Sequence, residues 1–208
     1  MSHRLTLLRH GQSLANRDGV VQGHLDSPLS DLGREQTESI ARAWLSEGLR
    51  FDLIIASPLL RARETAEIIA ARMGLPLELD ASWMERDLGH AQGMSIDAFL
   101  ELSGRRPASP FGPVFGDGEG AWDLYLRAAG AAQAVVRRSP GHYLIVSHGG
   151  LLNAALRAML GIAPGTGRAP RFNFSNAGHA HLEMDDQGAW TLHALYNPPG
   201  SLPDDSET

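Results

Sequence analysis

The sequence contains no cysteine. This absence excludes disulfide bonds, metal sites built on thiolates and enzymes that use a cysteine nucleophile. Histidine, with nine copies, is therefore the natural candidate for a side chain that forms a covalent intermediate.

Long hydrophobic runs are also missing. No stretch approaches the roughly 18 apolar residues that a membrane-spanning helix needs. The segment from Met1 to Ala15 lacks the apolar region and the small-residue cleavage site of a secretory signal. We therefore expect no membrane partner and a cytoplasmic location.

Basic residues are too few for a general nucleic-acid-binding protein. Eighteen lysines and arginines face 24 acidic residues, which gives a net charge of −6. Nucleic-acid-binding domains normally carry a basic surface, so no nucleic-acid partner is expected. An anionic small molecule would instead need a few arginines placed at its site.

The remaining composition is that of an ordinary globular protein. Hydrophobic residues make up 43% of the 208 residues, enough for one domain with a sizeable core and room for a small cap. We expect a single catalytic domain over residues 1–196. The tail, residues 197–208, is rich in Pro, Gly, Ser and acidic residues and is expected to be mobile.

Three strand-turn-helix units are visible in the hydrophobic pattern. Apolar strands are predicted at Leu5–Leu8, Leu53–Ala56 and Tyr143–Val146, and each is followed by a polar turn and then a helix. These helices are expected from Ser30 to about Glu47, from the Ser57-Pro58 pair through Met73, and over Leu151–Leu160. Further strands are predicted at Phe172–Phe174, Ala180–Met184 and Trp190–Leu195, and another helix over Glu119–Arg138. Repeated units of this kind predict an α/β fold, a three-layer α/β/α sandwich with a mixed, mostly parallel sheet.

One segment is too rich in proline and glycine for regular structure. Residues 103–120 contain three prolines and five glycines, which favours a surface loop or lid. Its Arg105 and Arg106 either contact a substrate anion or are solvated loop charges.

Each of the three strand units ends in residues that can bind phosphate. Arg9 and His10 follow the first, Arg61 lies just beyond the second, and His148 follows the third. Ligands of open α/β sheets bind beyond the carboxyl ends of the strands, so these side chains are expected to converge. Cations there would stabilise the charge of a transferring phosphoryl group, and a neutral imidazole is a competent nucleophile.

Such a reaction also needs a carboxylic acid to protonate the leaving group. The region after the second unit offers Glu78, Asp80, Glu85, Asp87 and Asp97, and spacing alone does not choose among them.

The sequence resembles the histidine phosphatase superfamily, which includes the cofactor-dependent phosphoglycerate mutases. The resemblance spans roughly Arg4 to His181. It rests first on the opening motif Leu8-Arg9-His10-Gly11-Gln12-Ser13, followed by Asn16, Gln22-Gly23, Asp26, Pro28-Leu29 and Gly33. It rests also on the segment from Ser57 to Ala66, on Val146-Ser147-His148-Gly149-Gly150, and on Met84-Glu85 followed by Gly89 and Gly93. Two positions depart from the family pattern: Ser13 stands where threonine is usual, and Gly118-Glu119-Gly120 where Gly-Glu-Ser is common.

The resemblance implies a phosphoglycerate mutase-like fold and a role for each motif residue. His10 would be the nucleophile and Glu85 the proton donor. Arg9, Arg61 and His148 would clamp the phosphoryl group. Asn16, Gln22, Gly23 and Gly149 would contribute to binding the phosphate or substrate, although Asn16 and Gln22 could equally stabilise turns.

Our leading hypothesis is a phosphatase that hydrolyses small phosphomonoesters through a phosphohistidine. One alternative is a mutase, which would need 2,3-bisphosphoglycerate as a primer; the other is an inactive phosphate-binding module. The expected partner is a small phosphorylated metabolite, and the sequence leaves a homodimer open. The resemblance also implies that hydrolysis needs no metal or organic cofactor. The alternating pair His179 and His181 could ligate a metal, but it has no identifiable third ligand.

Overall fold

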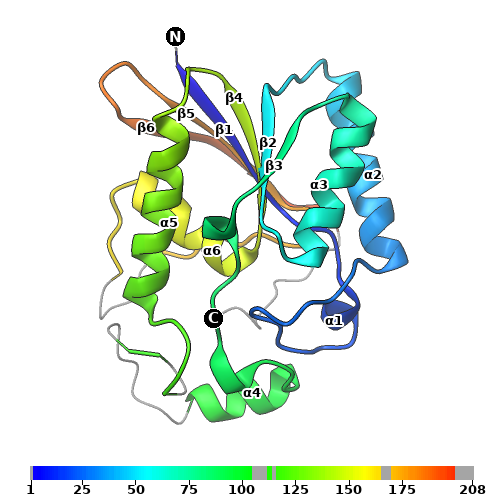
Figure 1. Cartoon of the computed structure of the whole chain (residues 1–208), viewed down its shortest axis with the longest axis vertical. Helices are drawn as coiled ribbons and strands as arrows, with labels where there is room; N and C mark the ends of the chain where they lie inside the picture. Colours follow the sequence, from blue (N-terminus) through cyan, green and yellow to red (C-terminus); the bar gives the residue numbers. More distant parts are fainter. Residues whose placement is uncertain (1, 105–111, 114–115, 165–169, 200–208) are drawn as a thin grey trace.

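A six-stranded sheet lies between two layers of helices (Figure 1). The computed structural model describes residues 2–104, 112–113, 116–164 and 170–199. The strand order is β3-β2-β4-β1-β5-β6. The strands are β1 (His3–Arg9), β2 (Leu53–Ala56), β3 (Leu77–Leu79), β4 (His142–Ser147), β5 (His179–Met184) and β6 (Trp190–Tyr196).

Neighbouring strands confirm the mixed, mostly parallel sheet. β4 pairs in parallel with β1 on one side and with β2 on the other, and β2 pairs in parallel with β3. β5 is antiparallel to both β1 and β6. The hydrophobic pattern does not predict β3, because this edge strand has only three residues and none of them is buried.

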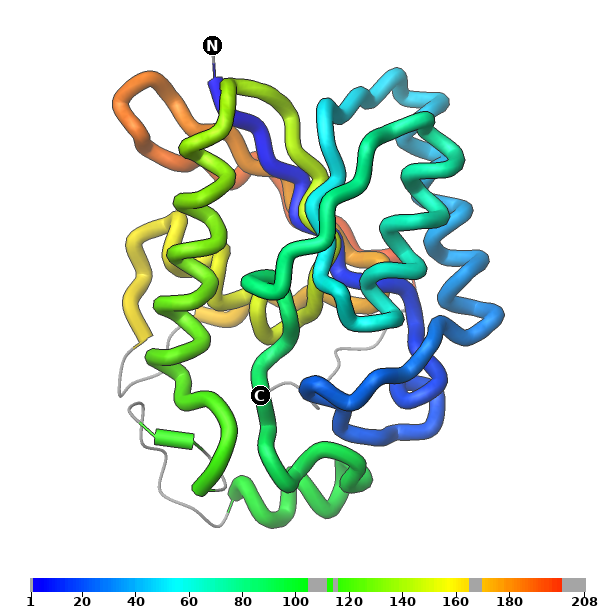
Figure 2. Tube along the Cα trace, viewed as in Figure 1, coloured from blue at the N-terminus to red at the C-terminus, as the bar shows by residue number. Residues whose placement is uncertain are grey.

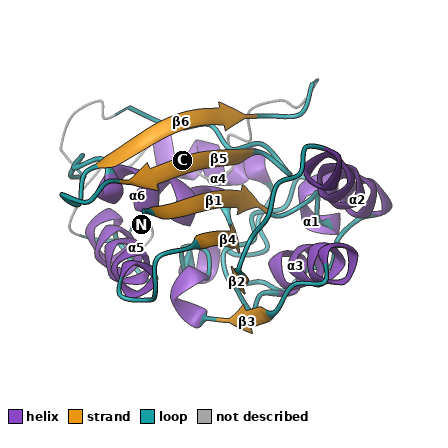
Figure 3. Cartoon of the chain, turned by 90° about the horizontal axis from the view of Figure 1, so that it is seen from above, coloured by secondary structure: helices purple, strands orange, loops and turns teal. Residues whose placement is uncertain are grey.

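Helices cover both faces of the sheet, as Figure 3 shows from above. α2 (Asp31–Ser46) and α3 (Leu60–Met73) lie on one face; α5 (Ala121–Val136) and α6 (Gly149–Met159) lie on the other. The short α1 (Leu14–Arg17) and α4 (Ile96–Gly104) lie beyond the carboxyl ends of the central strands. The three-layer architecture is therefore confirmed.

The central strand β4 explains why the predicted strands are continuous apolar runs. All six of its residues are buried. Leu144 and Val146 pack with α2 and α3, whereas Tyr143 and Ile145 pack with α5 and α6. A strand covered on both faces is apolar at successive inner positions, here from Tyr143 to Val146, and each buried Leu or Ile side chain stabilises the fold by about 1.5–3 kcal/mol.

Two local predictions are wrong. Helix α3 begins at Leu60 with Leu59 as its N-cap, not directly after Ser57. Residues 172–174 do not form a strand, because side chains bind their backbone instead. Asn153 Nδ2 donates to Phe172 O at 2.6 Å, and Arg9 donates to Phe174 O at 2.8 Å.

A small cap covers the carboxyl ends of the strands. A separate apolar cluster there consists of Val21, Ala91 and Phe99. Phe99 belongs to helix α4, which forms part of this cap (Figure 2). Helix α4 extends to Gly104, so its last two residues overlap the start of the predicted loop over 103–120. Arg105 and Arg106 lie outside the described residues.

The residue after strand β6 is also bound to the fold. Asn197 is tied to the fold, because its Oδ1 accepts a hydrogen bond from Ser175 N at 2.8 Å and its Nδ2 donates to Asn173 O. Residues 200–208 of the predicted tail fall outside the described part of the chain. Within that part, no helix is both long and apolar enough to cross a membrane.

Candidate active site

The carboxyl ends of β1 and β4 place two histidines side by side. Arg9 is paired with Ser147 in the parallel register, and His10 N donates to Ser147 O at 3.0 Å. The next residue along each strand is His10 in one case and His148 in the other, and their ring centroids are 5.1 Å apart. The predicted convergence therefore follows from the register of two adjacent parallel strands.

Hydrogen bonds fix the tautomer of His10. Its Nδ1 lies 2.7 Å from Gly11 O, and since a carbonyl oxygen can only accept, Nδ1 must carry the proton. Its Nε2 lies 3.2 Å from Arg61 Nε, which can only donate. The Nε2 lone pair of a neutral imidazole therefore faces the guanidinium of Arg61.

Burial keeps this imidazole neutral. His10 is fully buried, and this loss of solvation lowers its pKa well below the ordinary value of 6.5. The positive charges of Arg61 and Arg9 lower the pKa further, against a smaller opposing effect of the Gly11 hydrogen bond. His10 can therefore act as a nucleophile across the neutral pH range.

Arg61 is held in place by three hydrogen bonds. Besides the contact with His10, its NH1 donates to Leu25 O at 3.0 Å and its NH2 to Gly23 O at 2.8 Å. Arg9, also fully buried, donates to Phe174 O. Two buried guanidiniums beside one imidazole form a strongly cationic site, as a phosphoryl dianion requires.

His148 is positioned by the end of strand β2. Its Nε2 lies 2.8 Å from the hydroxyl of Ser57, and the oxygen of that hydroxyl accepts a hydrogen bond from Leu59 N at 3.3 Å. Burial is the main cause that lowers the pKa of His148 well below 6.5, followed by the charge of Arg61. Nδ1 of His148 is buried with no hydrogen-bond partner among the described residues.

Glu85 lies at the N-terminus of helix α6. Its Oε1 accepts hydrogen bonds from Arg86 N and Leu151 N, and its Oε2 accepts one from Gly150 N at 3.1 Å. A carboxylate oxygen has two lone pairs, so Oε2 retains one that can carry or receive a proton. The structure thus brings one carboxylate of the region to the site.

The competing acids lie elsewhere. Glu78 forms an exposed ion pair with Arg138, Asp80 caps a short 3-10 helix (Ala81–Trp83), and Asp97 is exposed. Asp87 accepts a hydrogen bond from Gly89 N.

The other predicted binding residues divide into two groups. Gln22 and Gly23 line the cavity that opens from Arg61 and Glu85. Asn16 belongs to the capping box of α1 together with Ser13, whose hydroxyl also donates to Gln22. Gly149 is the first residue of α6 and is buried.

The cavity has a volume of about 270 Å³ and begins at Arg61, the residue that bonds His10; the two histidines themselves do not line it. Arg61, Glu85 and Gly150 form one end. Apolar side chains of α4 and α5 and of the segment before α4 form its wall, and Arg157 and Arg171 line it as well. It can accommodate a phosphate ester with its organic group.

His179 and His181 do lie on one face of β5, with ring centroids 5.1 Å apart. His181 Nδ1 is 2.9 Å from the hydroxyl of Thr6. Across the described residues, no group of three or more His, Asp or Glu side chains is arranged to hold a metal ion.

Comparison with known proteins agrees with this geometry. Residues 5–198 match the histidine phosphatase superfamily (branch 1). The chain belongs to this superfamily. The match contains all five predicted catalytic residues, from Arg9 to His148.

Relatives within the superfamily include proteins named as phosphatases and as phosphoglycerate mutase-like proteins. The glucosyl-3-phosphoglycerate phosphatase of Mycolicibacterium vanbaalenii is 35% identical over 76% of this chain and 75% of its own. Phosphoglycerate mutase-like protein 4 of Arabidopsis thaliana is 34% identical over 72% and 68%. A solved mycobacterial glucosyl-3-phosphoglycerate phosphatase superposes with a TM-score of 0.78 at 29% identity, covering 94% of this chain and 99% of that one.

Sequence reasoning missed the residues that hold Glu85 in place. Arg127 donates to the carbonyls of Ser82, Met84 and Glu85 and forms a bidentate ion pair with Glu119. Glu119 lies in the segment that aligns with the family's Gly-Glu-Ser pattern, which was the available signal.

Proposed function

We propose that this member of the histidine phosphatase superfamily hydrolyses small phosphomonoesters through a phosphohistidine at His10. The observation that carries the proposal is the fixed tautomer of His10, with Nδ1–H bonded to Gly11 O and the Nε2 lone pair beside Arg61. The phosphatase names among the relatives support a hydrolase.

In the first step, the Nε2 lone pair attacks phosphorus and the bond from phosphorus to the ester oxygen breaks. Glu85 transfers a proton from Oε2 to the departing alkoxide, which leaves as an alcohol. Arg9 and Arg61 stabilise the charge on the equatorial oxygens. The Ser57 hydroxyl donates to His148 Nε2, so that the buried Nδ1–H of His148 donates to a phosphoryl oxygen.

In the second step, water attacks the phosphohistidine and gives its proton to the Glu85 carboxylate. The N–P bond breaks, inorganic phosphate forms and His10 returns to its neutral state. Every group in this scheme comes from the chain itself, so we expect activity without added metal.

The deciding experiment is phosphate release from a panel of small phosphomonoesters in the presence of a chelator. The wild type is compared with His10→Ala and with His193→Ala, a matched change at an exposed histidine. We expect His10→Ala to lose about 10³-fold or more in kcat and His193→Ala to retain full activity. Acid-labile labelled phosphoprotein should appear only when His10 is present.

The same panel separates the alternatives. Isomer formation from 3-phosphoglycerate that exceeds phosphate release would establish a mutase. Binding of phosphate or vanadate without any turnover would establish a phosphate-binding module. Either result would overturn the phosphatase proposal.

A further inference from the structure

One face of helix α6 runs along the cavity from the reacting end to a second cationic site. Gly150, Asn153, Ala154 and Arg157 all line the cavity and follow the i, i+3, i+4, i+7 spacing of a single helical face. Gly150 contacts the Glu85 carboxylate at one end of this face, and Arg157 lies two turns further along. Seven residues correspond to about 10 Å of helix.

Hydrogen bonds to α6 hold the second arginine of this site, Arg171. Asn153 brackets Phe172, donating to its carbonyl at 2.6 Å and accepting from its amide at 3.3 Å. Arg157 Nε donates to Pro170 O at 3.0 Å. The segment around Arg171 is thus strapped to the helix on both sides, and Arg171 lines the same cavity.

No carboxylate of the described residues neutralises these two positive charges, because neither Arg157 nor Arg171 forms an ion pair with one there. By contrast, Arg86, which also lines the cavity, has Glu85, Glu119 and Asp123 as neighbouring charges. Burial and, less strongly, the charge of Arg171 lower the pKa of the half-buried Arg157, whereas Arg171 is exposed.

Five large and largely apolar side chains line the same cavity, together with the polar Asn153 of α6. They are those of Leu88, Phe99, Leu124, Tyr125 and Pro164. Tyr125 and Leu124 project from α5, which packs against α6. A ligand that filled the cavity would therefore place an apolar middle between two anions.

We propose that the substrate is an elongated phosphomonoester whose second, distal anionic group binds between Arg157 and Arg171. This inference rests on the proposed phosphatase function and specifies its substrate class. The transferred phosphoryl group lies at His10 and Arg61, an alkyl or aryl body lies along Tyr125 and Phe99, and a carboxylate or second phosphate reaches Arg157. A carboxylate only one carbon from the phosphate ester is too short to bridge the two ends.

The test compares hydrolysis of four compounds: hexyl phosphate, 6-phosphonooxyhexanoate, hexane-1,6-diyl bisphosphate and phosphoglycolate. Wild-type kcat/KM should be about tenfold or more higher for the six-carbon substrate with a distal carboxylate or phosphate than for hexyl phosphate. Phosphoglycolate should show no such advantage. The ratio of kcat/KM for the substrate with a distal carboxylate to kcat/KM for the bisphosphate shows which anion the site prefers.

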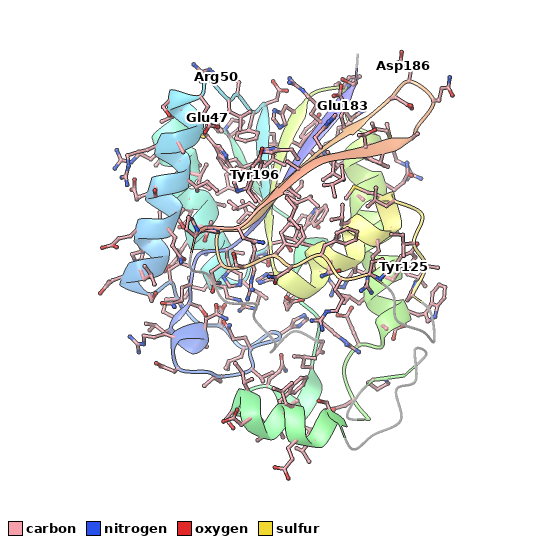
Figure 4. The ribbon with its side chains drawn as sticks, turned by 180° about the vertical axis from the view of Figure 1, so that it is seen from behind. Glu47, Arg50, Tyr125, Glu183, Asp186 and Tyr196 are labelled. Atoms are coloured by element: carbon pink, nitrogen blue, oxygen red, sulfur yellow. The ribbon has the colours of Figure 1, made fainter. Side chains whose placement is uncertain are left out.

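Arg157→Gln and Arg171→Gln remove the charge while leaving a side chain that can donate a hydrogen bond. Each should reduce the advantage of the distal anion about tenfold and reduce kcat/KM for hexyl phosphate much less. The matched control is Arg50→Gln at an exposed arginine far from Tyr125 (Figure 4), which should leave all four substrates unchanged.

Equal kcat/KM for the six-carbon substrates with and without a distal anion would overturn the distal site but not the phosphatase. An equal loss of kcat/KM for both kinds of substrate in the two variants would do the same. If the wild type hydrolyses none of the four, the phosphatase proposal fails instead. Calorimetric binding of the matching phosphonates then tests the distal site by itself. The site is supported if the phosphonate with a distal carboxylate binds more tightly than hexylphosphonate and loses this difference in Arg157→Gln. It is overturned if the two phosphonates bind equally.

Discussion

Glu85 fits beside helix α6 because residue 150 is glycine. A β-carbon at position 150 would lie 2.6 Å from Glu85 Oε1 and 3.3 Å from its carboxyl carbon. No backbone atom is that close, so the carboxylate is the group that would have to move. The family motif Gly149-Gly150 therefore makes room for the proposed proton donor, Glu85, as well as forming the start of the helix.

Gly150→Ala should reduce kcat about tenfold or more, because the displaced carboxylate no longer reaches the leaving group. KM should change little, since Arg9, Arg61 and His148 are untouched. Steady-state kinetics with an alkyl phosphomonoester measures both constants.

The matched control is Gly130→Ala in helix α5, where a β-carbon meets no atom within 4 Å. It should stabilise the protein by about 1 kcal/mol through helix propensity and leave kcat unchanged. Wild-type kcat in a folded Gly150→Ala protein would show that Glu85 is not the proton donor.

Arg61→Lys should reduce kcat by about a hundredfold although it preserves the charge. The guanidinium bonds His10 Nε2, Leu25 O and Gly23 O through three separate nitrogens, and a single ammonium cannot reproduce that fork. Stopped assays of phosphate release give the rates.

Arg63→Lys, two residues later, is the comparison for that change, because Arg63 forms an exposed ion pair with Glu67. Its activity should equal the wild type. Similar losses in both variants would assign the effect to helix α3 and not to the active site.

The two histidines and two arginines of this site could be predicted from the sequence because each ends a strand, directly follows one or lies in the first turn of a helix. Register between adjacent parallel strands then brings them together without any further information. Glu85 is different. It lies in an irregular segment whose path depends on Arg127 and on the amides of α6, both distant in sequence, so only the family resemblance selected it.

The same limit applies to the segment at residues 172–174. Its apolar pattern predicts a strand, but side chains of Asn153 and Asn197 take the hydrogen bonds that a neighbouring strand would have made. Long-range side-chain contacts of this kind also place Arg171 in the cavity, and no local pattern signals them.

The low pKa of His10 has a direct spectroscopic consequence. Because burial and two arginines disfavour the imidazolium, His10 should stay neutral, with the proton on Nδ1, as pH falls through the ordinary histidine range. Nitrogen NMR of labelled protein should show a protonated Nδ1 and an unprotonated Nε2 at pH 6. Exposed His193 serves as the internal comparison. An imidazolium signal for His10 at that pH would contradict the assigned nucleophile.

Buried His142, outside the active site, should make the fold sensitive to acid. Burial is the main cause that lowers the pKa of His142 to about 4, and its Nε2 is 2.9 Å from the Thr6 hydroxyl. The unfolded chain binds the proton near pH 6.5, well before the folded one does. Its contribution to stability is therefore complete above pH 6.5 and is lost as pH falls from there toward 4.

His142→Gln should accordingly have a shallower pH dependence of the unfolding free energy between pH 6.5 and 4, by at most one bound proton. His193→Gln, at an exposed position, should keep the wild-type slope. Urea denaturation at a series of pH values measures the slopes. The same slope in His142→Gln and the wild type would show that His142 is protonated alike in the folded and unfolded chain, and that its burial beside Thr6 and Phe51 contributes nothing to acid sensitivity.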